Sequence, residues 1–332
     1  MSYQTLPIKR RISQYDLIRS LAIFFVFCIH SLGVANEEYA KGGFNFCGQI
    51  IYNAFNTIVY TAVPLFVMLS GALLLGGANR VEDFLGRRFK RILIPFIWWS
   101  IILFGLSIFK EHKDLSIMLI PEFINKFLTY GVHGVYWYVY LIIGLYLITP
   151  LLRPFFRNAN NKELLYAFSI CTLFVIISAL FPDVRWVKGF HSDYFVYIAY
   201  FICGYIIAHY LRDLKYTKDF SLIVTLVILV LCTINGIYKF TTLPLDFFMS
   251  LSLFTLMLYV PIKETKPLLF VSNASYGMYL SHVVFISIFL KLGFSDKLPL
   301  WIEPFAMACI VMIAECALML VIKKMKLNRW LN

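Results

Sequence analysis

Apolar residues follow one another along this chain in ten runs, which are separated by short polar segments. Each run is close to the roughly 20 residues that an α-helix needs to cross the hydrocarbon core of a bilayer. The pattern therefore predicts an all-α integral membrane protein with about ten transmembrane helices in a single domain, residues 1–332. The predicted helices are, approximately, Leu17–Ala35, Ile58–Gly77, Ile92–Phe109, Val135–Leu152, Leu164–Phe181, Tyr194–Leu211, Phe220–Tyr238, Leu245–Ile262, Ala274–Leu292 and Leu298–Ile322.

The composition excludes a soluble protein. Of the 332 residues, 61% are hydrophobic and only 14% are charged, whereas soluble domains have about 25% charged residues. A soluble domain of about 300 residues still exposes about a quarter of the surface that its unfolded chain exposes, so it cannot bury this much apolar area. The same figures exclude disordered, collagen-like and coiled-coil chains.

The positive charges are distributed unevenly among the segments that join the runs. When both termini are placed on one side, that side receives 21 of the 30 Lys and Arg residues and the other side receives nine. Positive residues favour the cytoplasmic side, so both termini are predicted to be cytoplasmic. The formal net charge of +12 then reflects topology and attraction to anionic membrane lipid, and we expect no nucleic-acid partner.

Two of the joining segments are long, about Asn36–Thr57 and Lys110–Gly134, and both are expected to be loops on the outer side. The first apolar run has two features of a signal peptide, because three cations precede it and Gly33–Ala35 resembles a cleavage site. The run is long for a signal peptide and contains Arg19 and His30. We therefore expect it to be retained as the first helix.

Ionisable side chains inside a membrane cost about 2.5–3.5 kcal/mol each on insertion scales and are therefore candidates for function. Asp16, Arg19 and His30 share one face of the first predicted helix, because their spacings of three and eleven residues are close to whole helical turns. Along the helix axis His30 lies roughly 16 Å beyond Arg19. Imidazole is well suited to take and return a proton near neutral pH. The alternative is that Arg19 pairs with Asp16 at the membrane surface while His30 bonds a neighbouring helix.

Five cations lie within residues 80–91, ahead of the third predicted helix. The tendency of positive residues to lie on the cytoplasmic side explains such a cluster by itself. Arg88 and Arg91, however, are three residues apart on one helical face, a geometry suited to binding phosphate groups from the cytosol. Ser70 and Gly71, near the end of the second predicted helix, are typical of close helix packing as well as of a site.

Three polar side chains, Ser275, Tyr279 and His282, form a stripe along the ninth predicted helix. A stripe of this kind is typical of interhelical hydrogen bonds and equally of a functional site. Trp137 lies at an outer membrane boundary, where an aromatic belt is expected. Glu315 lies near the middle of the tenth predicted helix, and the sequence names no partner for it.

The sequence lacks several common catalytic motifs. No two His, Asp or Glu residues stand at metal-ligand spacing on one predicted helix, so no metal is expected. There is no Gly-rich phosphate loop and no Gly-x-Ser-x-Gly nucleophile elbow. These observations disfavour ATP-driven pumps and the commonest hydrolases, and no bound cofactor is expected.

Taken in order, the polar residues resemble the motifs of the acyltransferase 3 family, the ten-helix membrane O-acyltransferases that modify bacterial glycans. Arg19 and His30 fit the Arg/Lys-x10-His pattern of the family's first helix, and Arg88 and Arg91 fit its cytoplasmic Arg-x-x-Arg motif. The segment Val63–Gly71 resembles its second-helix block. Two further sets fall where the family has corresponding residues, namely Ser275, Tyr279 and His282 in its late Ser-x-x-x-Tyr-x-x-His segment, and Trp137 and Pro150. In length and single-domain form the chain is similar to the stand-alone enzymes that acetylate enterobacterial common antigen.

This resemblance implies a reaction. The donor would be a cytosolic acyl-CoA, expected to be acetyl-CoA, and the acceptor a hydroxyl of a cell-surface glycan or of its lipid-linked precursor. Arg88 and Arg91, with the neighbouring Arg87, would meet the CoA phosphates, and Arg19 would line the entrance. His30 would act as general base on the acceptor hydroxyl or carry the acyl group transiently. The residues expected to contact the acceptor or to support the site are Asp16, Ser70, Trp137, Ser275, Tyr279, His282 and Glu315.

The resemblance also implies a place in the cell, the bacterial inner membrane, and glycan-assembly proteins as possible partners. Two other classes of function stay open. A transporter of a glycan precursor or an organic ion would use intramembrane His and Glu residues as proton relays, although no inverted repeat is visible in the sequence. A non-catalytic partner in a glycan-assembly complex is the third possibility.

Overall fold

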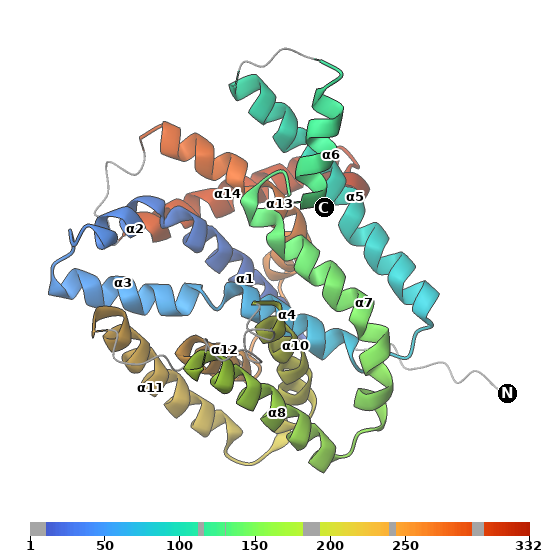
Figure 1. The fold of residues 1–332 in the computed structure, drawn as a ribbon, viewed down its shortest axis with the longest axis vertical. Coiled ribbons are helices and arrows are strands. Elements are labelled where there is room, and N and C mark those ends of the chain that lie inside the picture. Colours follow the sequence, from blue (N-terminus) through green and yellow to red (C-terminus); the bar gives the residue numbers. More distant parts are fainter. Residues whose placement is uncertain (1–10, 112–115, 130, 182–192, 239–243, 294–301) are drawn as a thin grey trace.

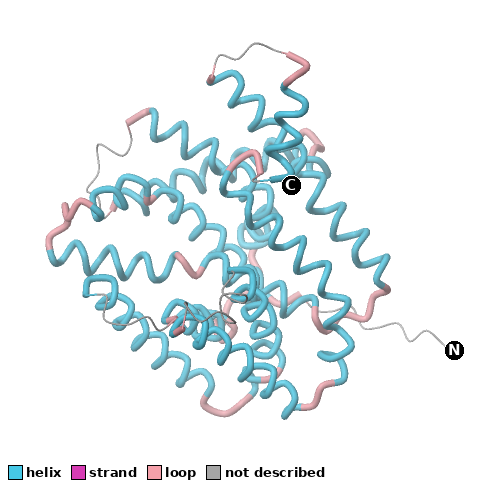
Figure 2. The backbone as a smooth tube through the Cα atoms, in the orientation of Figure 1, coloured by secondary structure: helices cyan, strands magenta, loops and turns pink. Residues whose placement is uncertain are grey.

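The computed structural model describes residues 11–111, 116–129, 131–181, 193–238, 244–293 and 302–332. Every regular element in these ranges is a helix, as the ribbon and the tube both show (Figure 1 and Figure 2), and the predicted all-α fold class is confirmed. The elements are α1 (Ser13–Ser31), α2 (Gly33–Ala40), α3 (Phe46–Val59), α4 (Ala62–Leu74), α5 (Val81–Lys110), α6 (Leu119–Thr129), η1 (Gly134–Tyr136), α7 (Trp137–Asn158), α8 (Asn161–Leu180), α10 (Asp193–His209), η2 (Leu211–Asp213), α11 (Thr217–Tyr238), α12 (Leu245–Met257), α13 (Lys266–Lys291), α14 (Glu303–Lys324) and α15 (Asn328–Leu331).

Eight helical segments of the described chain are long and apolar enough to cross a membrane. They coincide with eight of the ten runs predicted from the sequence. The other two runs are the first, which falls on α1, and the eighth, which falls on α12. The 13 residues of α12 are too few for a full span. The chain is therefore an integral membrane protein built of helices, and the count of ten remains a prediction.

The helix α1 lies inside the bundle rather than at its edge. It packs against α13, α14, α4, α3 and α12, and none of its 19 residues is exposed. Its most apolar positions, such as Ile18, Ile23 and Phe27, are completely buried. The polar residues of α1 therefore face other helices instead of lipid, which removes most of the cost of placing them at membrane depth.

The expectation of a long loop at Asn36–Thr57 is wrong, because α2 and most of α3 occupy this segment. The cap at Asn45, whose side chain accepts a hydrogen bond from the Gly48 backbone N–H at 2.8 Å, starts α3. Buried amides and hydroxyls then bond within the protein: Asn53, for example, donates to the hydroxyl of Tyr39 in α2 at 3.0 Å. Because these polar residues of α3 face the interior of the protein, the sequence pattern does not look like that of a helix in contact with lipid.

The second predicted span consequently begins at Phe46 rather than at Ile58. It consists of α3 and α4, which are separated by a break at Tyr60 and Thr61. In the segment Lys110–Gly134, α6 likewise replaces part of the expected loop. The break in the α3–α4 span matters for function, because the two halves of that span line different cavities, as described below.

Two glycines bring α4 and α10 into direct backbone contact. A Cβ atom at Gly71 would lie 1.8 Å from the carbonyl oxygen of Phe201, and one at Gly204 would lie 2.2 Å from that of Met68. Small residues at such crossings let helix backbones approach closely in membranes. This contact fixes α4, whose inner face lines the cavity described in the next section.

We predict that Gly71→Ala destabilises the protein by about 1–3 kcal/mol, because the methyl group has no space and the two backbones must separate. The matched control is Gly144→Ala in α7, where an added Cβ meets no atom within 4 Å. The measurement is the thermal midpoint of each purified variant in the same detergent. Equal midpoints for the two variants would contradict the close contact of α4 with α10.

Candidate functional site

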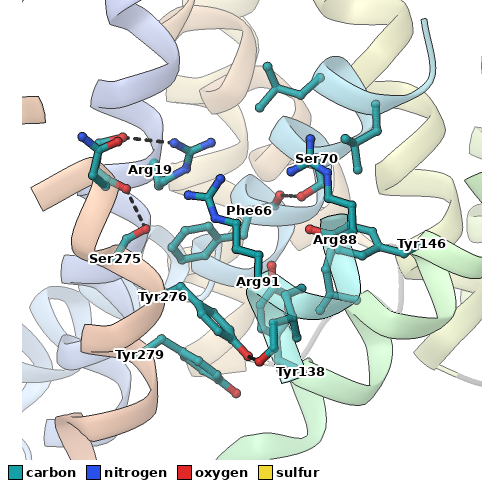
Figure 3. Close-up of a pocket in the computed structure, with 16 residues that line it drawn as sticks. Arg19, Phe66, Ser70, Arg88, Arg91, Tyr138, Tyr146, Ser275, Tyr276 and Tyr279 are labelled. Carbon is teal, nitrogen blue, oxygen red and sulfur yellow. Dashed lines mark hydrogen bonds between the residues drawn. The ribbon is translucent and has the colours of Figure 1, made fainter. Parts of the chain in front are cut away.

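Five helices, α1, α4, α5, α7 and α13, enclose a cavity of about 130 Å³. Its polar lining includes three guanidinium groups, those of Arg19, Arg88 and Arg91, together with serine and tyrosine hydroxyls (Figure 3). We call it the arginine cavity after these three residues. Pockets that hold a whole drug-sized ligand measure about 300–1,000 Å³, so this cavity encloses only part of a large ligand.

The arginines of α5 reach the cavity because the helix starts several turns before its apolar part. It begins at Val81. The carboxylates of Glu82 and Asp83 lie in its first turn, where their negative charge interacts favourably with the helix dipole and stabilises the helix. Arg88 and Arg91 then fall on the face that looks into the cavity. The guanidinium carbon of Arg88 lies 5.9 Å from the ring centre of Tyr146, a cation–π distance.

Arg87 lies outside this cavity. Its side chain is exposed, and its Nε donates to the backbone oxygen of Asp83 at 2.9 Å, one turn earlier in the same helix. Successive residues of a helix point about 100° apart, so Arg87 and Arg88 cannot both face the same cavity. The structure therefore brings together two of the three α5 arginines named from the sequence.

The carboxylate of Asp16 has a different partner from the one considered in the sequence. Arg11, which precedes α1, forms a bidentate pair with it: Nε donates to Oδ2 and Nη2 to Oδ1, each at 2.7 Å. This pairing raises the pKa of Arg11, chiefly through the hydrogen bond to Asp16. Ser272 of α13 also donates to Asp16 Oδ1, at 2.6 Å, and its hydroxyl oxygen accepts from Arg19 Nη1 at 3.2 Å. Asp16 is thus paired directly with Arg11, and Arg19 meets it only through the Ser272 hydroxyl.

Aromatic rings line one end of the arginine cavity. Tyr138 of α7 and Tyr279 of α13 meet there in an edge-to-face pair, with ring centres 5.5 Å apart. The Tyr279 hydroxyl donates to the backbone oxygen of Val135, and that of Tyr276 donates to the backbone oxygen of Ile92 at 3.0 Å. The phenol hydrogens are therefore committed, and the rings act as fixed walls.

Two histidines lie next to Tyr279, at the aromatic end of the arginine cavity. The rings of His30 and His282 are 5.0 Å apart between centres, and the ring of His282 is 5.8 Å from that of Tyr279. His282 is completely buried, whereas His30 is half-buried and does not line the arginine cavity itself. The structure therefore brings together His30, Tyr279 and His282, which the sequence places on two different helices.

The tautomer of His282 follows from its contacts. Its Nδ1 lies 2.6 Å from the backbone oxygen of Tyr279, and since a carbonyl only accepts, Nδ1 must carry a hydrogen. In the neutral ring Nε2 is then a hydrogen-bond acceptor. This atom is buried and has no hydrogen-bond partner among the described residues. An unpaired buried acceptor beside a second imidazole is typical of a place where another group binds.

The remaining predicted residues are distributed around this site. Ser70, whose hydroxyl donates to the backbone oxygen of Phe66 at 2.9 Å, and Ser275, whose hydroxyl donates to that of Ser272 at 3.0 Å, both line the arginine cavity. Glu315 of α14 is completely buried, and its Oε2 lies 2.7 Å from the hydroxyl of Ser281. It therefore braces α14 against α13 behind the histidine pair, outside the cavity lining.

Trp137 is 38% exposed and stands one residue before Tyr138, at the start of α7. Its ring packs against Tyr138 and Tyr197, so it borders the site through its neighbour and does not enter the cavity.

Sequence reasoning missed several lining residues. Tyr138 and Tyr146 repeat at a spacing of eight on α7, and Tyr276 stands one turn before the predicted stripe member Tyr279. Their spacing was the only available signal, and aromatic residues at helical spacing occur commonly in membrane helices. Arg11 gave no signal at all, because it precedes the periodic part of the first helix.

We predict that Asp16→Asn lowers the free energy of unfolding by about 1.5–3 kcal/mol, the range for a hydrogen bond to a charged group, since a neutral amide cannot hold Arg11 by a charged bidentate pair. The control is Asp213→Asn in η2, an exposed carboxylate. Thermal midpoints in detergent measure the effect. If both variants melt with the wild type, the Arg11–Asp16 pair does not anchor α1.

Comparison with known proteins adds one match. A family model described as an acyltransferase domain, that of acyltransferase 3, matches residues 12–323, nearly the whole chain. No match was found among curated proteins. No solved structure matches the chain either.

Proposed function

The chain belongs to the acyltransferase 3 family, and on that premise we propose that it transfers an acetyl group from cytosolic acetyl-CoA to a hydroxyl of a cell-surface glycan or of its lipid-linked precursor. Its membrane would be the bacterial inner membrane, with both termini cytoplasmic. The nearest functional likeness would be to the stand-alone enzymes that acetylate enterobacterial common antigen.

The observation that carries the proposal is the arginine cavity. Three guanidinium groups line it, and the nearest carboxylate, Asp16, already holds Arg11. An unbalanced cluster of this kind attracts phosphate, because each guanidinium offers several N–H donors in a planar fork. CoA carries its phosphates at one end and its thioester at the other. The phosphates would bind at the arginines while the acyl arm extends between Tyr138 and Tyr279.

The base in this proposal is His30, at the far end of that arm. Arg19 and His30 lie on one helix roughly 16 Å apart along its axis, so a donor bound at the arginines directs its thioester toward His30. In the first route, His30 takes the proton of the acceptor hydroxyl as the oxygen attacks the thioester carbon. The carbon–sulfur bond then breaks, and CoA leaves as its thiol after taking up a proton.

The second route uses His30 as nucleophile. The ring nitrogen attacks the thioester carbon, CoA leaves, and the acyl group is passed from the imidazole to the sugar hydroxyl in a second step. The acyl-imidazole would be a covalent intermediate, detectable by mass spectrometry of the intact protein after rapid mixing with acetyl-CoA alone. In both routes His282, held by its Nδ1 hydrogen bond, keeps the imidazole of His30 in place.

We predict that His30→Ala leaves the protein inserted but lowers the rate of acetyl transfer at least about 100-fold, the lower end of the contribution of a general base. The measurement is the transfer of label from radioactive acetyl-CoA into the glycan fraction of membranes. Insertion is checked by the yield and elution profile of the purified variant. Full transfer activity in a properly inserted His30→Ala protein would refute the assignment of His30.

A second prediction concerns the donor. Arg88→Ala and Arg91→Ala should each raise the KM for acetyl-CoA about tenfold, which corresponds to about 1.4 kcal/mol for one lost charged hydrogen bond. Arg87→Ala, on the same segment, decides between the sequence, which grouped it with the other two, and the structure, which places it outside the cavity. An unchanged KM for Arg87→Ala supports the structure. An unchanged KM for all three would rule out a phosphate site in the arginine cavity.

A further inference from the structure

A second polar cavity, of about 330 Å³, lies among α3, α11 and α12. Its lining includes the amides Asn53 and Asn56 from α3 and Asn235 from α11, and we call it the amide cavity after them. The first half of the broken α3–α4 span lines this cavity, and the second half lines the arginine cavity. The amide cavity therefore lies beside the break in this span, and the arginine cavity lies along its second half.

Most donors in the amide cavity are already used. Asn53 donates through Nδ2 to the Tyr39 hydroxyl at 3.0 Å and to the backbone oxygen of Gln49 at 2.9 Å. The hydroxyl of Thr57 donates to the backbone oxygen of Asn53 at 2.8 Å. The first bond joins α3 to α2, and the other two lie within α3.

Two hydrogen-bond acceptors of the amide cavity, by contrast, are available to a ligand. The side-chain oxygen of Asn56 is buried and has no hydrogen-bond partner among the described residues. The carboxylate of Asp246, at the start of α12, is exposed and meets the thiol of Cys232 only at 3.9 Å. A buried acceptor without a partner costs about 1–3 kcal/mol, so a ligand that donates hydrogen bonds would be stabilised here.

The lining also selects against anions. Among the described residues that line the cavity there is one carboxylate and no Lys or Arg, the reverse of the arginine cavity. Tyr60, at the break in the α3–α4 span, is 50% exposed and offers an aromatic face at the rim. Open acceptors, a single negative charge and an aromatic ring match an uncharged molecule with many hydroxyl groups.

The amide cavity is close to the end of α1 that carries His30. The helix α2 begins at Gly33, directly after α1, and its eight residues span about 12 Å. The hydroxyl of Tyr39 in α2 donates to the backbone oxygen of Gly236 at 3.0 Å, at the wall of the cavity. One short helix therefore separates the histidine from the cavity, a distance that a chain of a few linked sugars bridges.

We propose that the amide cavity binds a sugar residue of the acceptor glycan, next to the residue that is acylated. The proposal rests on the function proposed above and adds where the acceptor binds. Asp246 and Asn56 would accept hydrogen bonds from the sugar hydroxyls, and Tyr60 would pack against the ring. Binding energy gained at this distance from the reacting atoms would hold the acceptor hydroxyl at His30.

The test uses the full-length protein in membranes, radioactive acetyl-CoA, and surface glycan extracted from a host strain that lacks the gene. Asp246→Asn and Asn56→Leu keep the shape of each side chain but weaken or remove its acceptor. Each is expected to raise the KM for the glycan about tenfold, the fold-change for one lost hydrogen bond to a substrate hydroxyl, with the KM for acetyl-CoA unchanged. The matched control is Asp219→Asn, an exposed carboxylate in the first turn of α11 at the other end of that helix.

The outcomes are separable. If the wild type transfers acetyl groups and both cavity variants keep the wild-type KM for the glycan, the amide cavity is not an acceptor site and the proposed function stands. If the wild type transfers no acetyl group to any glycan fraction, the proposed function falls and this inference falls with it. Thermal midpoints and the KM for acetyl-CoA identify a variant that has lost its fold. Because the two substitutions lie on different helices, either one alone suffices for the test.

Discussion

The enclosure of α1 by five other helices is the constraint on which the rest of this structure depends. A helix with an aspartate, an arginine and a histidine on one face is expensive in lipid and becomes tenable only when other helices surround it. The pair formed by Asp16 and Arg11 balances the one carboxylate. It leaves Arg19 unbalanced in a cavity and His30 beside a second imidazole. Burial of α1 thus produces both ends of the candidate site at once.

The bundle holds two polar cavities with opposite chemistry along one broken span. The α4 half faces three guanidinium groups, and the α3 half faces amides and a carboxylate. The proposed function would use such an asymmetry, because its charged donor and its uncharged acceptor would need different binding sites. The break at Tyr60 and Thr61 lets the two halves adopt different directions, so each half aligns its own cavity. The contact of Gly71 with α10 then fixes the α4 half in place.

The sequence predicted what periodicity and charge can reveal. Runs of apolar residues located most of the apolar helices, and the spacing of Arg19 and His30 pointed to the face of α1 that carries both candidate residues. It failed for α3, because polar residues such as Asn53 and Thr57, which are buried inside the protein, interrupt the apolar run of this helix. It failed for Arg11 as well, because the partner of Asp16 lies outside the regular helix and only the fold brings it near. The placing of Arg87 outside the cavity depends on the rotation of α5, which sequence spacing alone does not fix.

The arginine cavity has a consequence for selectivity. Guanidinium groups attract nucleotides, inorganic phosphates and other polyanions with similar strength, and the cytosol contains many of these at high concentration. Under the proposed function, the arginines by themselves would not tell CoA from its competitors. Under the proposed function, discrimination would fall to the ring pair of Tyr138 and Tyr279, which would have to admit the thin, flexible arm of the donor and stop a bulky base or sugar. The arginines would then determine how strongly polyanions bind, and the two rings would determine which bound polyanion reaches His30.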